Sequence, residues 1–471
     1  MELDGKDARN GKPENEHSVN KKTSLITKLK DPTYRNVILR WLCLPIATLN
    51  LGLIESLQGT TIIDLEIITS TTKSMASLYF TAFNLGYLLG AIISGFLHGK
   101  INSYLLMCIV SVVGGIASIG THYCTTFALM FLIRCALGIC LGILLCVINA
   151  EHMQIWGTKG ESLLQLIHFN YALGGVFGPL IAAPFLAEEI TENKTLLHQN
   201  LTNYPYGNIS SHSDVALNST LPQTTNVHYA FLIGGLILVV TAIPALLSLI
   251  FFRKSMYQIK EIDNQQEHFD RILPLGLKIF FLVIIFWYFL SYCCVEVTFN
   301  SYLMTFIVEH FEEGTKQQGA YLTTYYWASF AGGRLISIFT SHYISAMRVL
   351  CIHLSLTAAA FIGFFVSSLY SRMDALTALT CLGGLACSAI IPAGVSWTEA
   401  EIMKVTGPVT AVIFIGTSTG SMVAPFIVEQ LMENVTNLWF CYSILVAIGS
   451  ALFFFLFLLS FNRCYVIKKY G

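Results

Sequence analysis

IATLNLGLIESLQG, residues 46–59, lies inside an apolar run long enough to cross a bilayer, yet it contains the acidic side chain of Glu55. A charged side chain at the centre of a membrane helix costs roughly 2.5–3.5 kcal/mol on insertion scales. A sequence that keeps this acid needs a partner for the charge or a use for it. The stretch therefore predicts a membrane-spanning helix with a functional acid inside it.

The composition is that of a membrane protein. Of the 471 residues, 54% are hydrophobic and 12% are charged, which is about half the charged fraction of a soluble protein. The net charge of −1 gives no field that would attract nucleic acid. Most of the 13 cysteines lie inside apolar runs, where cysteine behaves as a small hydrophobic residue. The polar N-terminal 35 residues predict a cytoplasmic N-terminus without a cleavable signal peptide.

Apolar runs of about 20 residues recur along the whole chain and predict an all-α membrane protein with twelve transmembrane helices in two six-helix bundles. The predicted segments are, in order, a tail at 1–36, a bundle at 37–252 with a long outer loop at 187–228, a linker at 253–276, a second bundle at 277–461 and a tail at 462–471. The expected spans are 37–59, 76–98, 103–123, 126–149, 163–186, 229–252, 277–299, 317–339, 347–369, 375–398, 406–430 and 437–461.

Two independent signals give the same orientation in the membrane. Lysine and arginine gather at the span ends that share a side with the N-terminus, which is the positive-inside bias of cytoplasmic loops. The N-x-S/T sequons fall on the opposite side, as expected for glycosylation outside the cell. The sequence therefore predicts a multi-pass plasma-membrane protein with both termini in the cytoplasm. The glycosylation candidates are Asn193, Asn200, Asn208, Asn218 and Asn434.

The two halves of the chain resemble each other at corresponding positions. The acid of span one, Glu55, matches Glu296 of span seven. Matches that keep their order indicate a six-plus-six duplication, which is typical of transporters whose site lies near the midplane between the halves. The matched pairs are LGLIES with CCVEVT, LGAIISGF (89–96) with GGRLISIF (332–339), NAEHM (149–153) with WTEAE (397–401), and GGVFGP (174–179) with GSMVAP (420–425).

This pattern resembles the major facilitator superfamily. GGVFGP in span five is similar to the fifth-helix motif of that superfamily, and the R-x-x-x-G-x-x-x-G pattern that starts at Arg134 is similar to its fourth-helix motif. The loop after span two departs from the usual pattern, because Gly99 stands where an aspartate is expected. The usual cytoplasmic charge latch of that loop is therefore in doubt here.

A closer resemblance covers most of the chain and concerns the sodium-dependent glucose transporter-like branch, the domain-containing protein 4 family of that superfamily. It implies uptake of glucose, another hexose or urea at the plasma membrane by a monomer, with sodium or a proton as coupling ion and no bound cofactor. The segments that carry it are LLQLIHFNYALGGVFGPLIAAPFLAE (163–188), VEVTFNSYLMTF (295–306), GRLISIF (333–339) and IPAGVSWTEAE (391–401).

Helices one, four, seven and ten line the central cavity in this superfamily, and the resemblance places Glu55, Arg134, Glu296 and Glu399 on them. At 1.5 Å per residue, Arg134 lies about 18 Å from His122 on the outer side, close to mid-membrane. An arginine fork at that depth holds a carboxylate, so Glu55 and Arg134 are predicted to pair and to couple the ion. The alternative is a structural pair that fixes helix register.

Residues that suit a sugar lie on several spans. Glu296 shares a helical face with Tyr292 and Asn300, and such acid, hydroxyl and amide groups hydrogen-bond sugar hydroxyls. Trp397 follows a predicted break at Pro392–Gly394 and resembles the sugar-stacking tryptophan of facilitative glucose transporters. The alternatives are a solvated acid at the mouth for Glu296 and an interface tryptophan for Trp397. Further candidates are Gln165, His168, Asn170 and Gln58, with Thr324, Tyr325 and Trp327 as weaker ones.

For His168, a structural hydrogen bond between helices is the alternative to a site role. Charged residues at the cytoplasmic span ends are predicted to form gating contacts. The gating candidates are Glu151, with Lys100 as its partner, and Glu399 and Glu401, with Arg334 or Arg348 as theirs.

Two other functions stay open. The same fold without ion coupling gives a facilitator of sugar, urea or another small polar solute, in which Glu55 is structural. A non-transporting membrane nutrient sensor would be favoured by long soluble domains, and the largest loop here is 187–228. A membrane enzyme or an ATP-driven pump is not predicted, because the sequence contains neither an H-E-x-x-H nor a GxxxxGK[ST] pattern.

Overall fold

The computed structural model describes residues 32–97, 99–156, 161–187, 225–251, 274–340, 343–405, 407–466 and 468. Four of the sequons, Asn193, Asn200, Asn208 and Asn218, lie outside these residues, whereas Asn434 is exposed at the end of a helix. The helices of the first half are α2 (Pro32–Trp41), α3 (Cys43–Thr69), α4 (Lys73–Leu97), α5 (Ser103–Gly120), α6 (Phe127–Trp156), α7 (Glu161–Ala182), α9 (His228–Val240) and α10 (Ala242–Phe251). Those of the second half are α11 (Leu275–His310), α12 (Lys316–Thr340), α13 (Ala346–Leu369), α14 (Met373–Cys387), α15 (Ile390–Trp397), α16 (Gly407–Asn434) and α17 (Trp439–Phe461).

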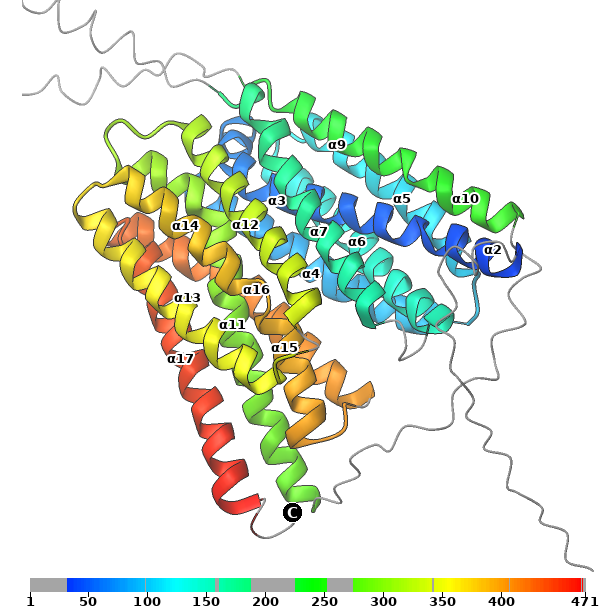
Figure 1. Cartoon of the computed structure of the whole chain (residues 1–471). Helices are drawn as coiled ribbons and strands as arrows, with labels where there is room; N and C mark the ends of the chain where they lie inside the picture. The colour runs from blue at the N-terminus through cyan, green and yellow to red at the C-terminus, as the bar shows by residue number, and fades with distance from the viewer. Residues whose placement is uncertain are drawn as a thin grey trace, which may run out of the picture.

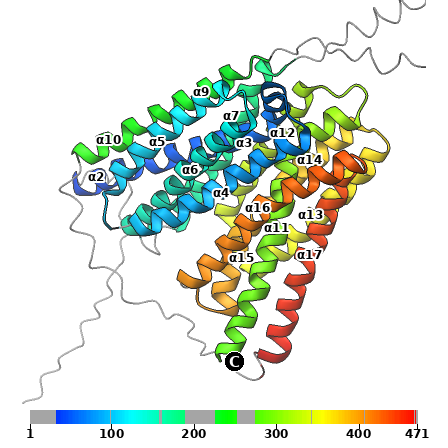
Figure 2. The same cartoon turned by 180° about the vertical axis from the view of Figure 1, so that it is seen from behind.

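These helices form two groups that follow the halves of the chain. In the first group α3 packs on α7 and α4 on α6, and in the second α11 packs on α16 and α17. Between the groups, α4 packs on α16 and α7 on α12. The two groups meet where α3 and α11 end, here named the closed end, and their axes diverge toward the start of α11, the open end (Figures 1 and 2). The predicted all-α fold is confirmed.

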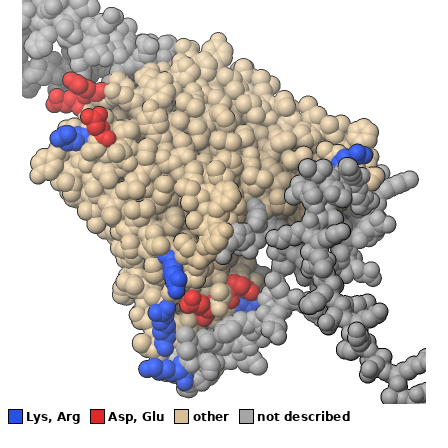
Figure 3. All heavy atoms as spheres, in the orientation of Figure 1, with Lys and Arg blue, Asp and Glu red and all other residues tan. Residues whose placement is uncertain are grey.

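The apolar surface of the molecule suits a bilayer. Eleven helical stretches of the described residues are long and apolar enough to cross a membrane. Helix α12 is not among them, because it is equally long but less apolar. Figure 3 shows charged side chains gathered toward the two ends, with a broad face between them free of charge. This is the surface that lipid chains require, since exposed charge within the hydrocarbon is costly.

Three spans are broken, and each break precedes a proline. Pro45, Pro244 and Pro392 each occupy the third residue of the second segment, in α3, α10 and α15. Proline lacks the N–H that would bond back across the break, whereas the first turn of a new helix needs no such donor. The predicted break at Pro392–Gly394 is therefore misplaced, because α14 ends at Cys387 and α15 begins before the proline.

Two glycines allow backbones to approach where any side chain would collide. A Cβ on Gly174 of α7 would lie 1.8 Å from the carbonyl oxygen of Leu49, so this position sets the packing of α7 on α3. A Cβ on Gly59 of α3 would lie 2.5 Å from the carbonyl oxygen of Asn300 on α11. Gly174 thus acts within the first bundle, while Gly59 sets how closely the two bundles meet.

The spans at the closed end are longer than the sequence predicts. Helix α3 continues to Thr69 rather than stopping at residue 59, and α11 continues to His310 rather than stopping at 299. Both extensions carry acids, and one forms a contact between bundles, with Lys73 Nζ of α4 2.6 Å from Glu309 Oε1 of α11. Gln430 of α16 donates to Ser74 of α4 beside it. Charged pairs therefore tie the two bundles together here.

Asp64 on the extension of α3 joins three parts of the closed end. Its carboxylate lies 3.5 Å from Lys316 Nζ of α12, and both side chains are buried. It also accepts hydrogen bonds from the Ala187 N–H at 2.7 Å and from the Thr225 hydroxyl at 2.5 Å. These two residues flank the outer loop, so one acid holds both ends of that loop and the neighbouring bundle.

The open end of the first bundle contains a second buried ion pair. Arg40 Nη2 lies 2.7 Å from Glu151 Oε2, and Arg40 Nε donates to the Tyr104 hydroxyl at 2.8 Å. The predicted pairing of Glu151 with Lys100 is wrong, because α2 brings Arg40 against the end of α6. The pair lies within one bundle, so it ties α2 to that bundle.

Replacing Glu151 with Gln is expected to lower the free energy of unfolding by about 3 kcal/mol, because the buried Arg40 loses its countercharge. Thermal unfolding of the purified protein measures the loss. Glu312→Gln, which alters an exposed acid, is the matched control. The double variant Arg40→Gln/Glu151→Gln should recover most of the loss, and a single variant as stable as wild type would contradict the assignment.

Candidate transport site

The two acids that the internal repeat relates, Glu55 and Glu296, act on each other electrostatically across the contact of α3 and α11. The hydroxyl of Tyr171 on α7 faces the Glu55 carboxyl. Glu296 Oε2 is buried and has no hydrogen-bond partner among the described residues. The repeat thus places one acid of each bundle at the junction of the bundles, and at least one acceptor there is unsatisfied.

Arg334 of α12 carries the positive charge that acts on Glu296 of this pair. Its charge acts on Glu296 and also on Tyr171, and its side chain stacks on Phe330 with Cζ 5.2 Å from the ring centroid. It forms no direct ion pair with Glu296 in the described structure, and its buried Nε has no partner there. A buried donor and a buried acceptor therefore lack partners among the described residues, and a hydroxyl group or a water molecule is the kind of group that satisfies each of them.

The predicted ion pair of Glu55 with Arg134 does not form. Arg134 is buried with Cζ 5.2 Å from the ring centroid of Phe231 on α9, which places it against the outer wall of its own bundle. Its Nε and Nη1 have no partner within the described residues. Span four presents Arg134 to Phe231 of α9, whereas α3 presents Glu55 to Tyr171 and Glu296, so the two side chains have different neighbours.

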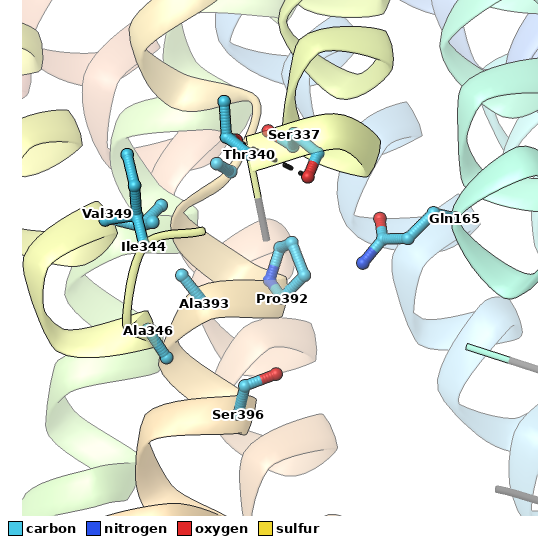
Figure 4. Close-up of a pocket in the computed structure, with 10 residues that line it drawn as sticks. Gln165, Ser337, Thr340, Ile344, Ala346, Val349, Pro392, Ala393 and Ser396 are labelled. Atoms are coloured by element: carbon cyan, nitrogen blue, oxygen red, sulfur yellow. Dashed lines mark hydrogen bonds between the residues drawn. The ribbon is translucent and has the colours of Figure 1, made fainter. Parts of the chain in front are cut away.

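The open side of the junction contains a pocket of about 100 Å³ between α7 of the first bundle and α12, α13 and α15 of the second (Figure 4). Gln165 extends from α7 toward Pro392 and Ser337, and its buried Oε1 has no partner among the described residues. The remaining polar lining is hydroxyl groups, including those of Thr340 and Ser396. A pocket lined by amide and hydroxyl groups without formal charge suits a neutral polar solute.

Other substrate-binding candidates lie around the same junction. His168 interacts electrostatically with Arg334 across α7 and α12. Asn170 donates to the Leu166 carbonyl at 2.8 Å within its own helix, and Tyr292 donates to the Cys387 carbonyl at 2.7 Å. Gln58 is buried in α3. Asn170 and Tyr292 are thus engaged with backbone, whereas His168 lies beside the central charges.

The aromatic residue at the centre is Trp327 rather than Trp397. Trp327 Nε1 donates to Asn300 Oδ1 at 2.6 Å, and its ring meets Tyr171 edge-on at 5.9 Å. Trp397 instead packs edge-on against Phe455 of α17 at 5.1 Å and does not line the pocket. On the short helix α15, Pro392 and Ser396 face the pocket. Trp397, the residue after Ser396, therefore points away from the pocket and into the bundle.

Replacing Trp327 with Phe is expected to weaken substrate binding by about tenfold, because the half-buried Asn300 loses its donor at a cost of about 1–3 kcal/mol. Trp397→Phe is the matched control and should bind like wild type, since its indole N–H has no partner to lose among the described residues. Binding of labelled sugar to the purified protein measures both. Equal losses in the two variants would contradict this placement.

The predicted latch of Glu399 and Glu401 with Arg334 or Arg348 is wrong for Arg334, which lies at the central junction instead. Glu399 accepts a hydrogen bond from the Val405 backbone N–H, and the Glu401 carbonyl accepts one from Asn462 at 3.0 Å. No ion pair of Arg348 is found within the described ranges. These acids therefore hold the turn that follows α15.

Arg334 carried the same sequence signal as Glu55, because both are charges within apolar runs. The sequence suggested only a gating role for Arg334, because this residue lies near the end of a span. In the structure α12 continues to Thr340 and is packed between α7 and α14, which places Arg334 at the central junction. Tyr171 carried no such signal, because a tyrosine in an apolar helix is equally typical of packing. Only the packing of α7 on α3 brings it to Glu55.

The fold and the paired bundles agree with the comparisons to known proteins. The Major Facilitator Superfamily profile matches residues 44–371, and the chain belongs to this superfamily of membrane transporters.

Relatives from the expected branch are similar to this chain over most of its length. Human sodium-dependent glucose transporter 1 is 28% identical over 393 residues, which cover 83% of this chain and 73% of that protein. Mouse sodium-dependent glucose transporter 1A is 28% identical, with 86% and 92% of the two chains covered. Major facilitator superfamily domain-containing protein 4A of Xenopus tropicalis is 24% identical, with 81% and 84% covered.

Solved structures share the fold at low sequence identity. A bacterial homologue of the human lysosomal transporter Spinster, in an inward-facing and unoccupied conformation, matches with a TM-score of 0.62 at 12% identity over 94% of this chain and 99% of that one. The transporter FucP in its outward conformation matches with a TM-score of 0.56 at 14% identity over 90% and 99%. These likenesses show that the chain shares the overall fold of these transporters.

Proposed function

We propose that this protein is a secondary transporter that moves glucose or a related hexose across the plasma membrane by alternating access, coupled to sodium or a proton. The observation that carries the proposal is the set of unpartnered buried atoms at the junction of the bundles. Glu296 Oε2 and Gln165 Oε1 are acceptors, and Arg334 Nε is a donor, each without a partner among the described residues. A solute with several hydroxyl groups donates to the first two and accepts from the third.

A hexose suits this site better than a charged solute. Two acids and one arginine act on the junction, so a carboxylate or phosphate ligand would meet repulsion from Glu55 and Glu296. A sugar hydroxyl both donates and accepts, so it satisfies acids and arginine together. The names of the relatives, which refer to glucose and sodium, support the same solute class.

We infer that the closed end faces the cell exterior and that the described state opens to the cytoplasm. The positive-inside pattern and the position of Asn434 support this orientation. Contacts such as Lys73–Glu309 then form the outer gate, and the pocket around Gln165 lies on the exit path. Alternating access requires the outer contacts to part and the open end to close.

The test is uptake of labelled glucose into proteoliposomes that contain wild type or Glu55→Gln, with sodium and pH gradients imposed separately. We expect one gradient to drive accumulation above equilibrium in wild type. Glu55→Gln should only equilibrate glucose, because the acid next to Glu296 can no longer change charge with the ion. Glu312→Gln, an exposed acid outside the junction, is the matched control and should accumulate glucose like wild type.

Equilibration of glucose by wild type and Glu55→Gln alike, with neither gradient having an effect, would indicate an uncoupled facilitator. Absence of any glucose movement would contradict the proposed substrate. In that case fructose and urea are the next solutes, because both meet the same need for hydrogen-bonding groups without charge.

A further inference from the structure

The closed end contains an excess of acid, partly buried, that the contacts described above do not neutralise. Glu66, Glu309, Glu429 and Glu433 surround it, with Lys73 as the cation among them. The charges of Lys73 and of the other three acids act on Glu429, and those of Lys73, Glu309 and Glu433 act on Glu66. The formal balance is four carboxylates against one ammonium group, and Glu429 is only 3% exposed.

Two hollows connect these acids to the surface. The outer one has a volume of about 600 Å³ and is lined by Glu66, Lys73, Glu309 and Glu433. The inner one is lined by Glu66, Lys73 and Glu309 again, and reaches Thr305 and Glu429. Its volume of about 10 Å³ is close to that of a single water-sized particle.

An independent observation points to a ligand at the inner hollow. Thr305 is 3% exposed, and its hydroxyl oxygen has no hydrogen-bond partner among the described residues. A buried hydroxyl without a partner is uncommon in folded proteins. Hydroxyl and carboxylate oxygens are the ligands that hard monovalent cations prefer, and a proton also binds a carboxylate.

The acids and the lysine belong to different bundles. Thr305 and Glu309 lie on α11, and Glu429 and Glu433 lie on α16, which packs on α11. We name these four residues the α11–α16 cluster. Lys73 lies on α4 of the other bundle, where its Nζ is 2.6 Å from Glu309 Oε1. When the bundles part at this end, the lysine leaves with its own bundle and the cluster loses its cation.

We propose that the α11–α16 cluster binds a monovalent cation when the closed end opens, and that the Lys73 ammonium replaces this cation when the end closes. No group of three or more His, Cys, Asp or Glu in the described ranges is arranged to hold a metal ion in the present state. The exchange ties cation release to closure of the outer gate. The inference rests on the proposed transport cycle but names a site apart from the sugar site.

Other charged groups near the cluster are few. The charge of Lys316 on α12 acts on Glu66, and its ammonium group is paired with Asp64. The Tyr302 side chain of α11 lies beside Glu429. Glu66 itself lies on α3 and moves away with Lys73 when the bundles part. The cation site of the opened state is therefore made by the C-terminal bundle alone.

The experiment measures binding of radioactive sodium to the purified full-length protein, and proton movement into weakly buffered proteoliposomes. Thr305→Val keeps the side-chain shape and Glu429→Gln keeps the volume, and each should weaken cation binding by about tenfold, because each removes a ligand oxygen or its charge. Lys73→Gln should strengthen binding, since it removes the competing ammonium. Glu312→Gln, at an exposed acid outside both hollows, should leave binding unchanged.

If sodium binding is weakened by Thr305→Val and Glu429→Gln and strengthened by Lys73→Gln, the site binds sodium. If proton movement changes in this way and no sodium binds, the site binds a proton. Cation binding unaffected by Thr305→Val and Glu429→Gln would overturn the proposal, and so would weakening by Lys73→Gln. Labelled hexose uptake is measured in parallel. If cation binding follows the expected order but no hexose is taken up, the proposed cation site is supported and the proposed substrate is wrong. If gradient-driven hexose uptake is the same in wild type and in the cluster variants, the proposed cation site is wrong and the proposed transport function is unaffected.

Discussion

Replacing Arg334 with Gln is expected to abolish gradient-driven hexose accumulation, to about 1% of wild type or less. Arg334 is the positive charge that acts on Glu296, which in turn acts on Glu55. Removing one partner from buried opposite charges costs about 3–5 kcal/mol, because the charge that remains is uncompensated. The variant also loses the donor Nε that we assign to a sugar hydroxyl, so binding and coupling should fall together.

Two matched variants separate charge from geometry. Arg334→Lys keeps the positive charge but not the planar fork of donors, so it should retain stability and lose most sugar affinity. The double variant Arg334→Gln/Glu296→Gln removes both charges and should recover thermal stability without recovering uptake. Uptake and thermal unfolding are measured on the same preparations. Accumulation by Arg334→Gln at the wild-type level would show that this arginine is structural.

Replacing Gly59 with Leu is expected to stop transport by holding the closed end apart. A Cβ at this position would already lie 2.5 Å from the Asn300 carbonyl oxygen and 3.0 Å from Ser301 Cα. Backbone atoms of α11 cannot yield as a flexible side chain can, so the two bundles must separate here. Each transport cycle requires this contact to form, and the collision should raise the free energy of the closed state by several kcal/mol. Uptake should therefore fall to about 1% of wild type.

Hydrogen–deuterium exchange distinguishes this effect from misfolding. Gly59→Leu should raise exchange at the ends of α3 and α11 and at the start of α4, while the first-bundle contact at Gly174 stays protected. Gly449→Leu on α17 is the matched control, because a Cβ there meets no atom within 4 Å. Near-normal uptake by Gly59→Leu, or uniform loss of protection along the chain, would contradict a gate role for this contact.

The span pattern could be predicted because apolar length is a local property. Eleven of the helical stretches satisfy it directly, and the expected spans agree with the helices to within a few residues along most of their lengths. The clearest differences are the extensions of α3 and α11, whose acids lower local hydropathy. Asp64 and Glu309 are tolerated there because Lys316 and Lys73 of the other bundle meet them, and a pairing between distant segments leaves no mark in a hydropathy profile.

Several residues of the candidate site could be predicted from the sequence, but the contacts between their side chains could not. Glu55, Glu296 and Asn300 could be found from unusual residue types in apolar runs, and the first two from the repeat. The partner of Glu55 could not, because several helices surround α3 and rotation of one helix by a fraction of a turn changes its neighbour. Arg134 faces Phe231 and Trp397 faces Phe455 for this reason.

The sequence by itself determined that this chain crosses a membrane as two repeated bundles with acids at their junction, since hydropathy, charge bias and repeat are written in residue order. The tertiary structure alone decided that Glu55 faces Tyr171 and Glu296, that Arg334 is central, and that Lys73 lies within the acids of α11 and α16. These contacts join segments far apart in the chain. Their energy depends on distances set by close helix packing, as at Gly59 and Gly174, and no local pattern encodes such distances.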